Sequence, residues 1–203
     1  KQKTAYEIST RDWSSDVCSS DLDRVSVAFR WILVAPIALF LATFDSLSPH
    51  MMSWFSGLLV IPVLISLVFR GKYPSYVLTF NHALLELCNR VTAYALLLHD
   101  GYPSIERDPR VGIIFPDIEG GKRLNQYLPL VKWLLAIPLY VVGIVYTFLS
   151  AIMTIFGWFA ILFTGSLPQS VASVNLGTMS FWNRVVGYAF ILVTDEYPSF
   201  ALN

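Results

Sequence analysis

The chain has 203 residues, of which 55% are hydrophobic, and its mean hydropathy is +0.58, on the membrane side of the globular range. It carries 14 Lys or Arg and 14 Asp or Glu, a balance that gives no indication of a nucleic-acid partner.

Residues 1–22 resemble a translated sequencing-library adapter rather than natural protein. Residues 1–8 read as an outer primer, 9–11 as a sample index and 12–22 as an inner primer in the same frame. We therefore expect the natural sequence to begin within a gene at Asp23, without its own N-terminus. Because Cys18 lies in the adapter, Cys88 remains, and one cysteine excludes a disulfide framework or a four-cysteine zinc site.

The first apolar stretches, 25–43 and 51–69, each match the roughly 20 helical residues that cross a bilayer. Residues 44–50 contain Asp45, Ser46, Ser48 and Pro49, which favours a turn between them. We predict a helical hairpin here.

A third helix should follow the Gly71 to Pro74 stop. His82, Glu86, Asn89 and Arg90 share one face of it, so it is predicted to be amphipathic and to lie at the membrane interface. A similar helix over 170–193 has a weaker stripe of Ser173, Asn183 and Arg184.

Residues 105–127 form the long polar linker of the chain. Within it, residues 111–115 have the composition of a short strand, which we expect to pair with a strand upstream of Asp23.

The second apolar block, 128–164, would be about 55 Å long as one helix, which is too long for one span. We predict a hairpin with a turn near 147–151, either transmembrane or re-entrant. Gly143, Thr147, Ser150, Ala151 and Thr154 would share one face, a small-residue pattern that allows close helix packing.

The chain also contains an internal repeat, which divides it into residues 23–104 and 128–203. Arg30-Trp31 to Pro36 matches Lys132-Trp133 to Pro138. Further matches join Gly71, Pro74, Asn81, Asn89, Arg90 and Tyr94 to Gly165, Pro168, Asn175, Asn183, Arg184 and Tyr188. One inserted residue later, Asp100 to Ser104 matches Asp195 to Ser199.

Basic residues flank the bases of the two predicted hairpins, whereas the predicted turns carry no Lys or Arg. Positive charge favours the cytoplasmic side, so we expect the hairpin bases and the C-terminus in the cytoplasm. Two crossings per repeat then make the repeats parallel, whereas spanning third helices would invert them.

The candidate site residues are the polar and aromatic groups that recur in the two third helices: Asn89, Arg90, Tyr94, Asn183, Arg184 and Tyr188. Arg90 and Arg184 either anchor the helices at the headgroups or line a lipid-headgroup or substrate site. Glu86 could pair with Arg90, or with His82 in a metal site, but two ligands are too few for a metal. We expect no metal, no cofactor and no catalytic residue.

The motifs Trp158 to Pro168, Asn183 to Tyr188 and Asp195 to Phe200 resemble the prokaryotic membrane family called domain of unknown function 4389, whose members often carry this unit twice. The resemblance implies a bacterial or archaeal membrane protein and brings no catalytic residue with it. Repeat one is looser, because Arg70 replaces the threonine before the glycine.

These observations predict an all-α integral membrane protein of two repeats, each a hairpin followed by an amphipathic interfacial helix. The expected function is a noncatalytic scaffold or accessory component that binds membrane lipid, another membrane protein or itself. A small transporter or channel is the alternative, and a membrane enzyme acting on lipid ranks third. Charge at mid-membrane depth would favour transport, and most of the charge lies at the edges.

Overall fold

The computed structural model describes residues 22–43, 58–106, 112–122 and 124–202. Residues 1–21 of the predicted adapter and the turn predicted at 44–50 lie outside this range. The described residues form helices and no strand, so the all-α prediction is confirmed for them.

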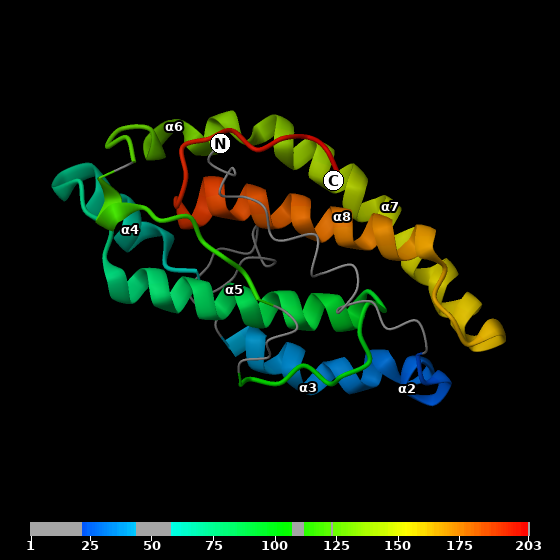
Figure 1. Ribbon diagram of the computed structural model, residues 1–203. Helices are drawn as coiled ribbons and strands as arrows, with labels where there is room; N and C mark the ends of the chain where they lie inside the picture. Colours follow the sequence, from blue (N-terminus) through cyan, green and yellow to red (C-terminus); the bar gives the residue numbers. More distant parts are fainter. Residues whose placement is uncertain (1–21, 44–57, 107–111, 123, 203) are drawn as a thin grey trace.

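Four helical segments lie side by side in one layer (Figure 1). In the centre are α5 (Ser75–Ala95) and α8 (Gln169–Val186). The outer positions are held by α3 (Arg30–Ala42), beside α5, and by α7 (Ile137–Thr164), beside α8. Shorter elements complete the fold: α2 (Arg24–Ala28), α4 (Val60–Arg70), the 3-10 helix η3 (Glu119–Gly121), α6 (Pro129–Leu135) and the π-helix η4 (Gly187–Ile191).

The two central helices run in opposite directions. Val77, near the start of α5, shares a core cluster with Val185 and Val186 at the end of α8. Ala93, at the end of α5, packs in a second cluster with Ala172, near the start of α8.

The hairpin predicted within 128–164 is wrong. Residues 137–164 form one continuous helix, α7, and the predicted turn residues 147–151 lie in its middle. The predicted turn contains no glycine or proline that would break the helix, and its polar groups are used in the fold. The Thr147 hydroxyl donates to the carbonyl of Gly143 at 2.8 Å, and that of Ser150 donates to Oδ1 of Asn175 in α8 at 2.7 Å.

The reversal of the chain instead occurs at the Gly-x-x-Pro segments. Gly165 ends α7 with φ +82°, a left-handed conformation that glycine adopts at little cost, and Pro168 precedes α8. Gly71 and Pro74 make the same connection between α4 and α5, with φ +60° at the glycine. The hairpin of this region is therefore α7 with α8.

The first predicted hairpin is not found as a pair of packed helices in the described residues, because α3 packs on α5, whereas α4 packs on α6 and η4. Of its second predicted arm, Val60–Arg70 is helical, and residues 51–57 lie outside the described range. The backbone N–H of Leu59 donates to Oδ1 of Asn81 in α5 at 2.9 Å. This bond replaces a helical partner and fixes the start of α4.

The strand predicted at 111–115 is also wrong for its described residues, 112–115, which have no regular secondary structure. The carbonyl of Ile113 lies 2.6 Å from Nε2 of His82, and the Phe115 ring packs edge-on against the same imidazole at 4.7 Å. A side chain of α5 thus holds this segment in place of a neighbouring strand.

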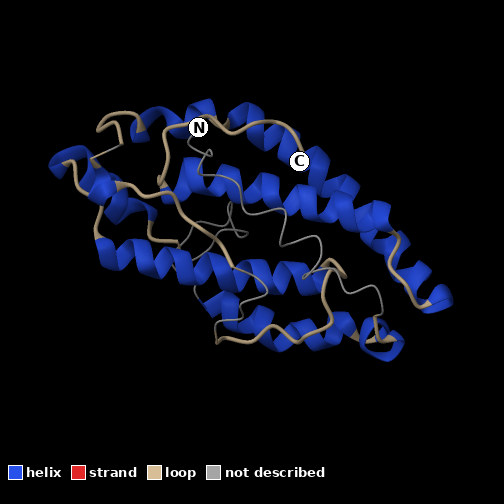
Figure 2. Ribbon diagram, in the orientation of Figure 1, coloured by secondary structure: helices blue, strands red, loops and turns tan. Residues whose placement is uncertain are grey.

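Residues 112–120, the described second part of the linker, lie beside the N-terminal part of α5 (Figure 2). The carbonyl of Ile113 meets His82 in α5, and the carbonyl of Gly120 accepts from the N–H of Tyr73 just before the helix starts.

Candidate functional site

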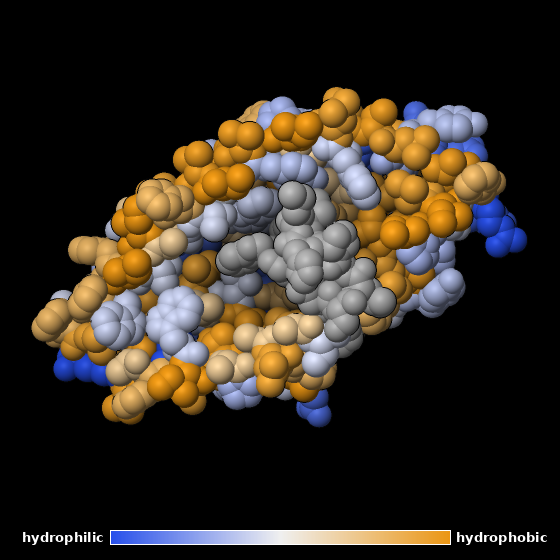
Figure 3. Space-filling model, turned by 180° about the vertical axis from the view of Figure 1, so that it is seen from behind, coloured by the Kyte–Doolittle hydropathy of each residue, from blue (hydrophilic) through white to orange (hydrophobic). Residues whose placement is uncertain are grey.

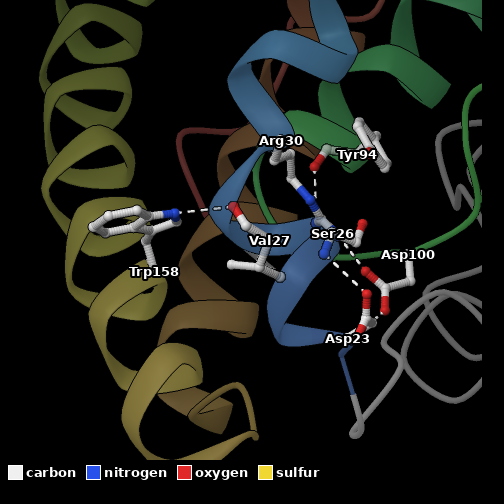
Figure 4. A network of polar contacts seen from close by, with 7 residues as sticks. All are labelled: Asp23, Ser26, Val27, Arg30, Tyr94, Asp100 and Trp158. Carbon is white, nitrogen blue, oxygen red and sulfur yellow. Dashed lines mark hydrogen bonds and ion pairs between the residues drawn. The ribbon is translucent and has the colours of Figure 1, made fainter.

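The first of two polar clusters is centred on Arg30, a guanidinium only 2% exposed (Figure 4). It forms an ion pair with Asp100, and its Nη1 donates to the carbonyl of Tyr94 at 3.1 Å. Its Cζ also lies 4.4 Å from the centre of the Tyr94 ring, a cation–π distance. Asp100 accepts in addition from the backbone N–H of Asp23 at 2.6 Å.

The short helix α2, which precedes the helix that carries Arg30, is attached to α7. The carboxylate of Asp23 caps α2 by accepting from the N–H of Ser26 at 2.9 Å. The indole of Trp158, from α7, donates to the carbonyl of Val27 at 3.0 Å (Figure 4). The cluster therefore links α2, α3 and the end of α5, and α2 docks on α7.

The second cluster is centred on Lys132 in α6, whose side chain has no exposed surface. Its Nζ lies 2.8 Å from Oδ1 of Asp195, donates to the carbonyl of Thr194, and is 5.2 Å from the centre of the Tyr188 ring. Burial lowers the pKa of Lys132, and the adjacent Asp195 carboxylate opposes this shift. The backbone N–H of Asn125 donates to Asp195.

The two clusters use residues at matched positions of the sequence. Arg30, Tyr94 and Asp100 correspond to Lys132, Tyr188 and Asp195, and the N–H groups that cap the carboxylates, those of Asp23 and Asn125, correspond as well. Each cluster also contains a second tyrosine at a matched position. Tyr102 packs edge-on against Tyr94 with 6.1 Å between the ring centres, and Tyr197 packs in the same way against Tyr188 at 5.7 Å.

The sequence predicts the two tyrosines as site residues but not their cations or carboxylates. A signal is present, because the repeat alignment places a cation, a tyrosine and an aspartate at matched positions. The three are distant in sequence, and periodicity within one helix cannot bring them together.

Asn89 and Asn183 form a direct pair where α5 meets α8. Nδ2 of Asn89 donates to Oδ1 of Asn183 at 3.0 Å, and Nδ2 of Asn183 donates to Oδ1 of Asn89 at 2.8 Å. Nδ2 of Asn89 also donates to the carbonyl of Leu85 at 2.9 Å. Each amide thus satisfies the other within the helix interface.

Arg90 and Arg184, the predicted anchors or site residues, both lie buried in the protein, with 6% and 7% of their surface exposed. Arg184 donates to Oγ of Ser180 at 3.1 Å and to the carbonyl of Ala201 in the C-terminal segment. For Arg90, the described residues provide no hydrogen-bond partner to Nε or Nη1.

The sequence predicts that Glu86 pairs with Arg90, or with His82 in a metal site; its Oε1 lies 3.8 Å from Nε2 of His82. No cluster of three or more His, Cys, Asp or Glu side chains that could hold a metal occurs among the described residues. Within each cluster, the buried cation and the carboxylate neutralise each other. The first pair is therefore suited to fixing the segment after α5 against α3, and the second to fixing the segment after η4 against α6.

Comparison with known proteins finds no curated protein and no solved structure that matches the chain. A family model does match one part of it. Residues 129–201, which contain α6, α7, α8 and the Lys132–Asp195 ion pair, match the family described as Domain of unknown function (DUF4389).

Proposed function

We propose that this protein is a noncatalytic membrane component, a scaffold or accessory protein that binds lipid or another membrane protein. The surface of α7 carries this proposal. Within the described residues it is the one helix long and apolar enough to cross a membrane, with a mean hydropathy of 2.1, and only 22% of its most apolar window is buried. The core helix of a soluble protein would be mostly buried.

The two sides of α7 differ in the size of their residues. The side that packs on α8 contains Gly143, Ser150, Thr154 and Gly157, whereas the opposite side exposes large apolar groups: Val141, Ile144, Val145, Phe148, Ile152, Ile155, Phe156 and Phe159. Small residues allow close packing on α8, and the outer side is suited to acyl chains.

The opposite edge of the layer is apolar as well. Trp31, Ile32 and Leu39 of α3 are exposed, as are Leu130 and Leu134 of α6 beside α7. Hydrophobic atoms follow both long edges of the molecule when it is seen from behind (Figure 3). A contact with the membrane along both edges would cover this surface.

The proposal includes two copies of one helical unit, related by a pseudo-twofold axis between α5 and α8. The matched clusters, the left-handed Gly71 and Gly165 and the antiparallel central helices support this relation. The Asn89–Asn183 pair supports it further, because reciprocal contacts between equivalent residues are characteristic of a twofold axis.

We further propose that the layer lies along the membrane surface, with its apolar edges in one leaflet of the cytoplasmic membrane of a bacterium or archaeon. The exposed apolar residues on both edges support this orientation, because a layer that lies along the surface brings the outer sides of α7 and α3 into the same leaflet.

The expectation that every hairpin base faces the cytoplasm rested on a turn inside 128–164, and α7 has none. In the proposed orientation both Gly-x-x-Pro turns still lie on the cytoplasmic side, because α7 does not cross. The pseudo-twofold axis then stands along the membrane normal, and the units are parallel.

Topology reporters test this orientation. One is attached after Pro74, a second within 119–122, and a third after Pro168, the matched turn at the far end of α7. The first two must agree because Gly120 bonds to Tyr73. A cytoplasmic third reporter, together with flotation of the protein on vesicles, supports the surface orientation.

A small transporter is the second candidate, favoured by the length of α7. Its 28 residues span about 42 Å, enough to cross the bilayer. A reporter after Pro168 on the side opposite to Pro74 would mean that α7 crosses, that the units are inverted, and that the linker lines a polar path.

A further inference from the structure

The guanidinium of Arg90 differs from the other buried cations of the described structure. Arg30 and Lys132 each have a carboxylate, and Arg184 has a hydroxyl and a carbonyl. Nε is buried without a hydrogen-bond partner in all three arginines, but in Arg90 Nη1 is buried without a partner as well. Two buried, unbonded nitrogens of a guanidinium carry a large desolvation penalty, so a charged partner is expected.

The matched position in the other unit shows how such a guanidinium is satisfied by the chain itself. Arg184 donates to Ser180 one helical turn earlier and to the carbonyl of Ala201. The alignment of Asp100 with Asp195 makes Glu106 the counterpart of Ala201. Glu106 is exposed, and its backbone N–H bonds to Oγ of Ser104 at 3.1 Å rather than joining Arg90.

The residue one turn before Arg90 is Glu86, which lies 3.8 Å from His82. One turn after Arg90 is Tyr94, whose ring lies 4.4 Å from the Arg30 guanidinium. In the helix register Arg90 falls between Asn89, which faces α8, and Val91, which packs with Ile37 of α3. Because α3 and α8 lie on opposite sides of α5, this register places Arg90 on a face of the layer, with a second guanidinium beyond Tyr94.

We propose that Arg90 binds an oxyanion, a phosphate group, which takes the place that Ala201 holds at Arg184. Guanidinium and phosphate form short charge-assisted hydrogen bonds, and phosphate is the commonest anion at a membrane surface. The inference rests on the proposed membrane role only for the source of the phosphate, which is either a lipid headgroup or the free anion.

The test measures the thermal unfolding midpoint of the full chain in a maltoside detergent, which contains no phosphate. The probes are phosphatidylglycerol, a galactolipid without phosphate, and sodium phosphate against sodium chloride at equal ionic strength. Phosphatidylglycerol should raise the midpoint by about 5–10 °C at about 100 times its Kd. The galactolipid should not.

Arg90→Gln is the decisive variant and Arg184→Gln its matched control. Without added phosphate, Arg90→Gln should leave the midpoint unchanged or raise it, because it removes an unpaired buried charge. Arg184→Gln should lower the midpoint, because it removes a bonded one. The rise with phosphatidylglycerol should disappear in Arg90→Gln and persist in Arg184→Gln.

The outcomes distinguish the two sources of phosphate and identify the results that overturn the proposal. A rise with sodium phosphate alone assigns the site to the free anion, and a rise with the phospholipid only assigns it to a headgroup. No rise with either probe, or the same rise in Arg90→Gln, overturns the proposal. A Glu106→Gln variant that loses stability in the wild-type background but not beside Arg90→Gln would also overturn it, since Glu106 would be the partner. Flotation of Arg90→Gln on vesicles reports separately on the membrane role.

Discussion

The two buried clusters have the same plan but different cations. The guanidinium of Arg30 binds both Asp100 and the carbonyl of Tyr94, a residue in the last turn of α5. Lys132 is a point charge that reaches Asp195 and the carbonyl of Thr194, beyond the end of the helix. Both clusters contain a carboxylate and a tyrosine ring beside the cation, but the carbonyl acceptor is that of Tyr94 in the first cluster and that of Thr194 in the second.

This change coincides with a one-residue difference in spacing, because Tyr94 and Asp100 are six positions apart and Tyr188 and Asp195 are seven. Between Tyr188 and Asp195, η4 (Gly187–Ile191) has the wider π-helical turn. A π-helical turn accommodates one additional residue within a helix without shifting the register of the next segment. Asp195 therefore still reaches its cation. Both clusters thus contain the buried ion pair, although the segments that carry the two aspartates differ in length.

The largest effect is expected from removing one carboxylate. Asp195→Ala should lower the free energy of unfolding by about 3 kcal/mol, because it leaves the fully buried Lys132 without a counter-charge. Asp100→Ala should cost a similar amount through Arg30. Denaturant unfolding in detergent measures both, and Lys132→Met, which removes the buried cation instead, should cost less than Asp195→Ala. Equal losses of unfolding free energy in Lys132→Met and Asp195→Ala would show that an unpaired buried charge is not the cause of the loss.

The next effect concerns the contact between α5 and α8. Asn89→Leu or Asn183→Leu alone should lower the free energy of unfolding by about 1–3 kcal/mol, because each leaves the partner amide in the interface without its hydrogen-bond partner. The double variant should recover most of that loss, giving a coupling of about 1–2 kcal/mol in a double-mutant cycle. Additive losses would contradict a mutual pair.

A smaller effect is expected where Tyr73 joins the first unit to η4. Its hydroxyl donates to the carbonyl of Ile191 at 2.7 Å in a buried setting, and burial raises the pKa of Tyr73. Tyr73→Phe should cost about 1–1.5 kcal/mol of unfolding free energy. Tyr146→Phe is the control, because its bond to the carbonyl of Phe200 is exposed and should matter less.

The smallest effect distinguishes the two turns. Gly165→Ala and Gly71→Ala should each cost about 1 kcal/mol, because both glycines have positive φ. The cost at Gly165 should be slightly larger, since an added Cβ would lie 3.1 Å from Nη2 of Arg24, whereas nothing lies within 4 Å at Gly71. Gly112→Ala, with space and no positive φ, serves as the control in thermal unfolding.

Much of the helical content could be predicted from the sequence, but the position of the chain reversal could not. The length of the 128–164 block exceeds one span and therefore favours a division, yet length alone says nothing about a helix that lies along a surface or extends beyond its neighbour. The sequence does predict a helix stop at Gly165 and Pro168, and the reversal occurs there.

The polar stripe of α5 shows the same limit. The helical period correctly places its residues on one face, and such a face in a membrane protein is predicted to meet headgroups. Asn89, Arg90 and Glu86 are instead buried. The helix pattern reports which residues share a face, and only a second helix with complementary groups, here α8 with Asn183, decides that the face points inward.

The sequence by itself determined the helical composition, the apolar character of α7 and the matched positions of the cations, tyrosines and aspartates, because these depend on residue type and spacing. The tertiary structure alone decided that Arg30 meets Asp100, that Lys132 meets Asp195 and that Asn89 meets Asn183, since each pair is separated by more than sixty residues. Contacts over such distances depend on how antiparallel helices pack, and no local pattern specifies that packing.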